Sequence, residues 1–346
     1  MKNKAFYMTG LKKMEAREIP VPDPADDEVL IKLEYVGICG SDVHYYENGR
    51  IGDFIVEGDF ILGHECAGTV IGTGKKVDRL KIGDKVALEP GCTCGKCIFC
   101  KTGRYNLCPD VKFLATPPYQ GCLMNYIAYP ADMCFRLPGN LSTREGALIE
   151  PLSVGIHAAG QGNVSLGSSV VILGAGCIGL VTLLACKAYG ATDITVVDVI
   201  PKRLEFAQKL GATRVINALE EDAAEAMEKL TGGAGTDVVI ETAGSAKTVA
   251  QTPYLVARGG KIVLVGMAPQ DVIPYNFAKI MAKEAEIHSV FRYRNIYPKA
   301  IQAVEKGIID VSQIVTNEFS FEETAKAFDY VINNKQDVVK AVIKID

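Results

Sequence analysis

Residue types that bind transition metals occur at dispersed positions along the sequence. Cys39 is followed by the pair His64 and Glu65 and, much later, by Glu150. One thiolate, one imidazole and carboxylates suit a catalytic zinc ion, which keeps one coordination position for water or a substrate oxygen. Taken singly, each residue has a simpler explanation: Cys39 as a buried thiol, His64 as a turn histidine, and Glu150 as a helix-capping acid.

A second set of possible ligands is compact. Cys94, Cys97, Cys100 and Cys108 lie in a loop rich in Gly and Lys. Four thiolates can close a tetrahedron around zinc and leave no position for substrate, so we expect a structural zinc site. An iron–sulfur cluster is the alternative, but seven residues precede the last cysteine here and three do so in the bacterial ferredoxin run. Cys92 is close enough to compete as a ligand.

A glycine-rich turn suggests a third kind of site. Gly174, Gly176, Ile178 and Gly179 belong to a G-x-G-x-x-G string that follows an apolar run and opens an Ala/Leu-rich stretch. In a strand–turn–helix context these glycines allow a tight turn, a close approach of the backbone to a pyrophosphate, and close packing of helix on strand. The helix N-terminus attracts the phosphate charge.

The acid that follows this turn predicts which dinucleotide binds. Asp198 ends the next expected strand, 19 residues after Gly179. A carboxylate there can accept hydrogen bonds from the adenosine ribose hydroxyls and would repel a 2′-phosphate, so NAD is favoured over NADP. The alternative is that Asp198 only caps the next helix. Lys202 and Arg203 could stack on the adenine or neutralise a phosphate.

The elements that must hold these residues fall into two patterns. Short β-type runs fill residues 1 to about 150, including 28–36, 67–71 and 85–88. From residue 169 apolar strands alternate with helical stretches, which predicts a parallel sheet covered on both faces. We expect strands at 170–173, 193–197, 238–240 and 261–265 and helices at 180–189, 201–210 and 246–257. The last segment predicts helices at 298–306 and 322–334 and a strand at 338–343, and we assign it to the first domain.

Composition excludes several classes of protein. The 346 residues carry a formal charge of −4, with 48% hydrophobic and 23% charged residues, and no long Lys/Arg run marks a nucleic-acid or membrane partner. We find neither a hydrophobic leader nor an apolar run of membrane-spanning length. The sequence therefore predicts a cytoplasmic protein, where the 11 cysteines serve in metal ligation or burial rather than in disulfides.

The order of these motifs resembles that of the zinc-containing medium-chain alcohol dehydrogenases, over nearly the whole chain. Within that family the chain looks most like the sorbitol (L-iditol) and xylitol dehydrogenases. The strings that carry this likeness are 38–45, 49–52, 115–118, 146–157 and 290–293. The resemblance implies an α/β protein with a GroES-like β-rich catalytic domain (1–152 and 295–346), a Rossmann NAD-binding domain with a doubly wound parallel sheet (153–294), and commonly a homotetramer.

The resemblance also implies residue roles. Cys39 and His64 would bind the catalytic zinc, with Glu65 and Glu150 completing the shell directly or through water. Ser41 is placed to pass on the hydroxyl proton, and His44 could carry it to solvent or be an ordinary surface histidine. The residues expected to bind a polyol are Tyr45, Phe113, Glu150, Arg292 and Tyr293, although Arg292 could instead be a surface or interface cation.

The expected reaction is hydride transfer from a secondary hydroxyl of a sugar alcohol to NAD. Zinc would lower the pKa of that hydroxyl, and the protein would align donor and acceptor and exclude water. One alternative is another medium-chain zinc enzyme acting on butanediol, threonine or a polyol phosphate. The other is a non-catalytic NAD-binding protein of the same fold, since fold alone does not establish activity.

Overall fold

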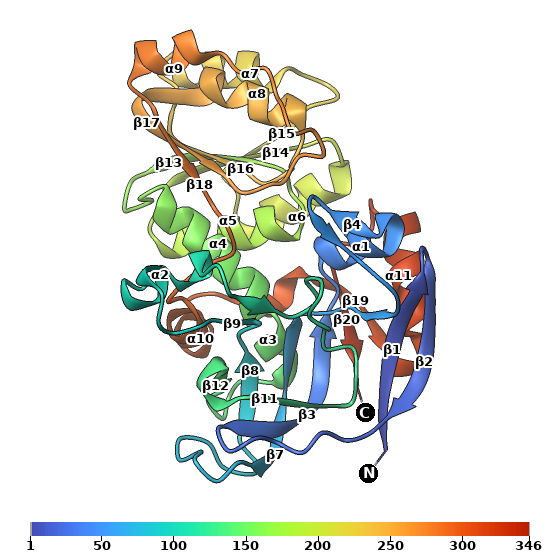
Figure 1. Cartoon of the computed structure of the whole chain (residues 1–346). Coiled ribbons are helices and arrows are strands. Elements are labelled where there is room, and N and C mark those ends of the chain that lie inside the picture. The colour runs from blue at the N-terminus through green and yellow to red at the C-terminus, as the bar shows by residue number, and fades with distance from the viewer. Residues whose placement is uncertain (1, 346) are drawn as a thin grey trace. The chain divides into compact units, whose positions relative to one another are not determined.

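A computed structural model describes residues 2–345 of the chain, which form two compact units (Figure 1). Unit 1 is Met1–Glu150 with Tyr297–Asp346, and unit 2 is Pro151–Ile296. The unit boundaries thus fall after residues 150 and 296, where the sequence predicts 152 and 294. Within the described residues, no helix is both long and apolar enough to cross a membrane.

Unit 1 is built on a seven-stranded sheet whose main path runs β12-β8-β7-β3-β20-β19, with β11 also paired to β3. Its central strand β3 pairs antiparallel with both β7 and β20, so segments from both ends of the chain meet on it. The strands of unit 1 are β1 (Asn3–Gly10), β2 (Lys13–Ile19), β3 (Glu28–Gly37), β4 (Arg50–Ile51), β5 (Phe54–Ile55), β6 (Phe60–Ile61), β7 (Glu65–Thr73), β8 (Lys85–Leu88), β9 (Gly91–Cys92), β10 (Lys112–Phe113), β11 (Tyr126–Pro130), β12 (Cys134–Arg136), β19 (Val315–Ser320) and β20 (Lys340–Lys344).

Short helices complete unit 1 around this sheet. They are α1 (Gly40–Asn48), α2 (Ile98–Lys101), α3 (Thr143–Ala147), α10 (Tyr297–Glu305) and α11 (Thr324–Asn333), with 3-10 turns η1 (Tyr105–Leu107), η2 (Ala131–Met133), η3 (Val311–Ile314) and η4 (Phe321–Glu323). Helix α4 (Ile149–Gln161) begins at the end of unit 1 and continues in unit 2.

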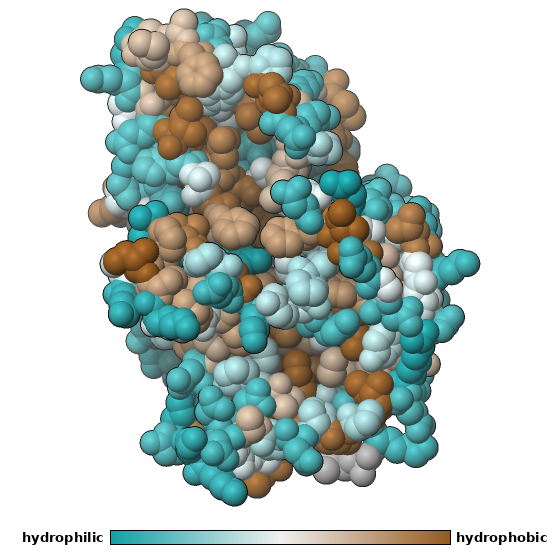
Figure 2. Space-filling view, in the orientation of Figure 1, coloured by the Kyte–Doolittle hydropathy of each residue, from teal (hydrophilic) through white to brown (hydrophobic). Residues whose placement is uncertain are grey.

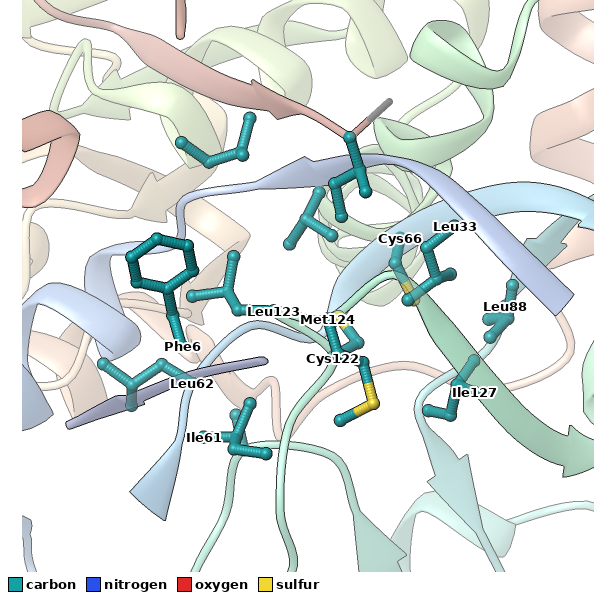
Figure 3. Packing of buried hydrophobic residues seen from close by; sticks show 14 of the residues in the cluster. Phe6, Leu33, Ile61, Leu62, Cys66, Leu88, Cys122, Leu123, Met124 and Ile127 are labelled. Atoms are coloured by element: carbon teal, nitrogen blue, oxygen red, sulfur yellow. The ribbon is translucent and has the colours of Figure 1, made fainter. Parts of the chain in front are cut away.

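The core of unit 1 forms where alternate side chains of its strands turn inward. Figure 3 shows Leu33 of β3, Cys66 of β7 and Leu88 of β8 in one cluster with Leu123 and Met124, and each of these side chains is buried. Burial of this apolar surface is the main favourable term in folding. The core therefore fixes β3 and β7 against each other, and these two strands lead into the candidate metal site.

Unit 2 is a six-stranded parallel sheet in the order β15-β14-β13-β16-β17-β18. Figure 1 shows α5 and α6 on one face of this sheet and α7, α8 and α9 on the other. The predicted doubly wound α/β class is therefore confirmed. The elements are β13 (Ser169–Leu173), α5 (Cys177–Ala188), β14 (Asp193–Asp198), α6 (Pro201–Leu210), β15 (Arg214–Asn217), α7 (Ala223–Thr231), β16 (Thr236–Glu241), α8 (Ala246–Leu255), β17 (Val256–Leu264), α9 (Phe277–Lys283) and β18 (Glu286–Ser289).

The expected boundaries between α8 and β17 are wrong, since the sequence predicts this strand only from residue 261. The helix predicted over 246–257 ends at Leu255, and Val256 already begins β17. The reason is that Val256 is extended and pairs with Thr236 on the neighbouring strand β16. A β-branched residue packs well in such a ladder, and the pairing outweighs the helical pattern that precedes it.

Candidate functional site

Three side chains of ligand type meet in unit 1. Cys39, His64 and Glu65 offer a sulfur, a ring nitrogen and a carboxylate oxygen that all lie within 4.8 Å of one another. The antiparallel pairing of β3 with β7 places Gly37 opposite Glu65, and this register brings the residues after β3 beside the start of β7. Ligand atoms of a tetrahedral zinc ion lie roughly 3.3 to 3.8 Å apart, so small side-chain adjustments suffice and the donor set fits zinc.

A buried carboxylate holds two of these residues. Asp42 lies on α1, and its Oδ1 accepts a hydrogen bond from the Gly63 amide at 3.0 Å and lies 3.3 Å from His64 Nδ1. Its Oδ2 accepts from the Cys39 amide at 3.2 Å. The contact to Nδ1 is an ionic approach without good hydrogen-bond alignment, because that nitrogen has no hydrogen-bond partner among the described residues. Since Nδ1 faces Asp42, Nε2 is the nitrogen left for a metal ion.

The same surroundings control the charge of His64. Burial alone would lower the pKa of this imidazole, but the nearby Asp42 and Cys39 outweigh burial and raise the pKa well above its usual value. A metal ion binds the neutral imidazole, so metal binding at this site is coupled to loss of that proton.

Glu65 has a buried counter-ion that the sequence did not predict. Lys340, on the last strand β20, donates from Nζ to both carboxylate oxygens of Glu65, at 2.7 and 2.6 Å, and to the carbonyl oxygen of Ile38 at 3.1 Å. The exposed fractions of the two charged side chains are only 2% and 1%. Space for this carboxylate exists because Gly37 has no side chain, since a Cβ there would collide with Glu65 Oε2.

The four-cysteine loop also forms a compact ligand set. The sulfurs of Cys94, Cys97, Cys100 and Cys108 lie within 4.8 Å of one another, and Cys92 is outside this set. Backbone amides point at the sulfurs, for example Cys97 N to Cys94 Sγ at 3.4 Å. Hydrogen bonds from the amides of Lys96 and Cys97 lower the pKa of Cys94 to about 7, which favours the thiolate that zinc needs. Four sulfurs fill a tetrahedral zinc shell and leave no position for substrate.

The glycine turn of unit 2 lies at the carboxyl end of β13. Gly174 has a φ of +105°, a conformation that favours glycine, and its amide donates to Val197 O at 2.8 Å. A Cβ on Gly179 would collide with the carbonyl oxygen of Gly174, whereas a Cβ on Gly176 would meet only Arg203 Nη1, at 3.9 Å. The turn thus has a tightly packed side and an open side, as a cradle for a pyrophosphate requires.

Asp198 takes part in this turn. Its Oδ2 accepts from the Ala175 amide at 2.6 Å, and its Oδ1 accepts from the Val199 and Ile200 amides at 2.7 and 2.9 Å. The carboxylate therefore orders the turn between β14 and α6 but does not cap the helix, because the N-cap is Ile200 and no side chain caps it. An ionised carboxylate has about four acceptor sites, so capacity for a ribose hydroxyl remains.

Comparisons with known proteins decide the family. Residues 25–139 match the alcohol dehydrogenase GroES-like domain and residues 177–306 match the zinc-binding dehydrogenase domain. The chain is a zinc-type medium-chain dehydrogenase. It is 48% identical over 340 residues to a sorbitol dehydrogenase of Bacillus subtilis (98% of this chain, 96% of the relative). It is 51% identical over 345 residues to an uncharacterized zinc-type alcohol dehydrogenase-like protein, YdjJ, of Escherichia coli (98% of this chain, 97% of the relative).

A solved structure agrees with this family. The crystal structure of an Escherichia coli oxidoreductase/dehydrogenase of unknown specificity, described as involved in membrane biogenesis, superposes with a TM-score of 0.96. Its sequence is 49% identical, and the match covers 100% of each chain. Together, the family models and these relatives confirm the predicted family, the GroES-like and Rossmann-type fold class, and the NAD and zinc cofactors.

The other expected residues of the dehydrogenase occupy varied environments. Phe113 lies beside a metal ligand, since its ring centroid is 5.7 Å from that of His64. Ser41, His44 and Tyr45 all lie on α1, where Ser41 is half-buried, His44 is exposed and Tyr45 is buried. Glu150 is buried at the start of α4 and is not one of the three ligand groups within 4.8 Å.

The remaining expected residues lie in unit 2. Arg292 and buried Tyr293 follow β18, and Arg292 has a φ of +58°. Its guanidinium carbon lies 4.8 Å from the Phe291 ring centroid. Ile178 is in the first turn of α5 and Arg203 is in α6, both half-buried. The roles of these four residues stay predictions.

Proposed function

We propose that this dehydrogenase oxidises one secondary hydroxyl of a small sugar alcohol, such as sorbitol, xylitol or L-iditol, to a ketone while reducing NAD. The observation that carries the proposal is the set Cys39, His64 and Glu65, in which a thiol, an imidazole and a carboxylate lie together beside a buried ionic network. Three protein ligands of this kind leave a fourth position on a tetrahedral ion, as catalytic zinc sites do.

The chemistry then divides between cofactors and chain. Zinc supplies a Lewis acid that lowers the pKa of the substrate hydroxyl, and NAD supplies the acceptor for the hydride. Asp42 holds the His64 ring and the Cys39 loop, so the ligands are set before substrate arrives. Glu150 is outside the three-ligand set, and we assign it to the shell through water, which keeps the fourth position for the substrate oxygen.

Proton release is assigned to α1. Ser41 would take up the substrate hydroxyl proton while giving its own hydroxyl proton towards the cofactor ribose, and His44, which is exposed one turn further along the same helix, would continue the relay to solvent. Polyol hydroxyls need fixed hydrogen-bond groups, which we assign to Tyr45, Glu150, Arg292 and Tyr293. Phe113 packs against the His64 ring and excludes water on that side.

A substrate panel tests the activity. NADH formation from sorbitol, xylitol and L-iditol should be lost on chelation and restored by zinc. Activity that survives complete removal of zinc would contradict the proposal. Butanediol, threonine and a polyol phosphate belong in the same panel, because a faster reaction with any of them would favour another medium-chain zinc enzyme.

One variant distinguishes catalysis from NAD binding alone. Cys39→Ser should abolish polyol oxidation while NADH binding, measured by calorimetry, stays within about twofold of wild type. Wild-type protein that binds NADH but oxidises no alcohol in the panel would favour the sensor instead.

We also propose that the protein is a homotetramer and that it works in the cytoplasm. The eleven free cysteines suit a reducing compartment. Strand β18 is at the edge of its sheet, and Phe277 and Met281 of α9 are 66% and 78% exposed. Figure 2 shows brown, apolar atoms in the region where Figure 1 labels α9. Such edges and patches commonly become subunit contacts, and light scattering in solution measures the subunit number.

A further inference from the structure

The carboxyl end of β16 holds two polar residues that the proposed function does not use. The chain order of the parallel sheet reverses between β13 and β16, because β14 lies on one side of β13 and β16 on the other. Ligands of such sheets bind outside the carboxyl ends of the strands at this reversal. Glu241 is the last residue of β16 and Thr242 follows it, so both lie directly across the reversal from Gly174.

Thr242 holds the glycine turn. Its hydroxyl donates to the carbonyl oxygens of Leu173 and Gly174, at 2.9 and 3.1 Å, and its amide donates to Leu173 O at 2.8 Å. The same hydroxyl oxygen would lie 2.9 Å from a Cβ on Gly174 and 3.0 Å from one on Gly179. The threonine therefore fills the space that both glycines leave.

This contact fixes one peptide plane from both ends. The carbonyl of the Gly174–Ala175 peptide is held by Thr242, and the N–H of that peptide donates to Asp198 at 2.6 Å. Because a peptide unit is planar, holding its oxygen also sets the direction of its N–H. Thr242 thus acts on the carboxylate proposed to bind the ribose, although the two residues come from opposite sides of β13.

Glu241 in turn holds the segment that carries Thr242. Its Oε1 accepts from the Gly244 amide at 2.9 Å and from the Thr248 hydroxyl at 2.7 Å. The side chain is fully buried, and its Oε2 has no hydrogen-bond partner among the described residues. Both hydrogen bonds to Oε1 come from the segment that follows Thr242, so this buried carboxylate orders that segment.

We propose that Thr242, supported by Glu241, is a positioning residue for the dinucleotide. It orients the Gly174–Ala175 peptide and, through it, Asp198 before NAD binds. This inference rests on the proposed function, because it assigns the Gly174 turn to NAD. This role depends on the hydrogen bonds of the Thr242 hydroxyl and not on the methyl group of the same side chain.

The test compares NADH binding by calorimetry in matched variants. Thr242→Val should raise the NADH dissociation constant about fivefold to tenfold, the loss expected for one well-placed hydroxyl. It should raise KM for NAD while kcat at saturating NAD stays within twofold. Thr242→Ser restores the hydroxyl and should bind within twofold of wild type. Thr236→Val is the control, since Thr236 is a buried threonine at the other end of β16 whose hydroxyl donates to Leu255 O at 3.2 Å.

The possible results distinguish failure of the proposed function from failure of the role of Thr242. Wild-type protein that fails to bind NADH overturns the proposed function. Wild-type binding with an unchanged Thr242→Val constant, or an equal loss in Thr236→Val, overturns only the role of Thr242. Should the valine variant not fold, Thr242→Ala provides the same comparison without an extra methyl group. Glu241→Gln keeps an oxygen acceptor and should bind NADH as wild type, whereas Glu241→Ala should bind more weakly.

Discussion

The buried pair of Lys340 and Glu65 permits a quantitative prediction. Lys340→Met removes the cation and leaves a carboxylate that is 1% exposed without its counter-ion. Breaking a buried ion pair by removing one partner costs about 3 to 5 kcal/mol in the metal-free protein. A bound zinc ion supplies another positive charge near Glu65, so we expect a smaller loss, by at least about 1 kcal/mol, in the zinc-loaded protein.

Hydrogen exchange is the suitable assay, because a chain of two units does not unfold in a single transition. In chelated Lys340→Met, amides of β3 and β20 should exchange on the order of 100-fold to several thousand-fold faster than in wild type. Lys344→Met is the matched control, since Lys344 is an exposed lysine on the same strand and should change stability by less than about 0.5 kcal/mol. An effect of less than tenfold in Lys340→Met, or one equal to the control, would refute the reasoning.

Three further predictions concern other sites. Burial raises the pKa of Glu89 to about 7 although Tyr105 donates to it at 2.7 Å; the stabilisation from its proton is complete below about pH 4.5 and is lost as pH rises through about 7. Glu89→Gln does not titrate, so between pH 5 and 8 the amides of β8 should exchange more slowly than in wild type at the same pH, by the equivalent of up to about 3 kcal/mol of stability. Cys97→Ser should lower the zinc content by one ion per chain in elemental analysis. The fraction of this variant that stays folded should still oxidise polyols. Asp198→Ala should weaken the preference for NAD over NADP, and an unchanged ratio of kcat/KM values would count against the ribose contact.

Local patterns predicted the elements whose start and end signals lie within the segment itself. The helix expected at 201–210 is α6 (Pro201–Leu210), because Pro201 begins it and Gly211 follows it in the left-handed conformation. The strand expected at 85–88 has the bounds of β8 (Lys85–Leu88). Such signals lie within the segment itself and need no tertiary information.

The sequence did not predict the groups that hold the site residues. Lys340 lies 275 positions from Glu65, and only the pairing of β20 with β3 brings the two together. A lysine within an apolar strand gives no local sign of its partner. The positioning roles of Asp42 and Thr242 were not predicted for the same reason, because their contacts to His64 and Gly174 join separate elements. Ligand types and glycine turns are visible in sequence, whereas the residues that orient them depend on tertiary register.

The return of the last strand to β3 affects how the molecule is made. While a ribosome is still translating residue 330, Cys39, His64 and Glu65 have already been synthesised, but the lysine that neutralises Glu65 has not. The sheet of unit 1 also lacks β19's neighbour β20 at that stage. Unit 2, by contrast, is one continuous segment, Pro151–Ile296. All of this segment has been synthesised by that stage. Unit 2 can therefore fold before Lys340 is made, whereas Glu65 in the metal centre gains its counter-ion only once Lys340 has emerged.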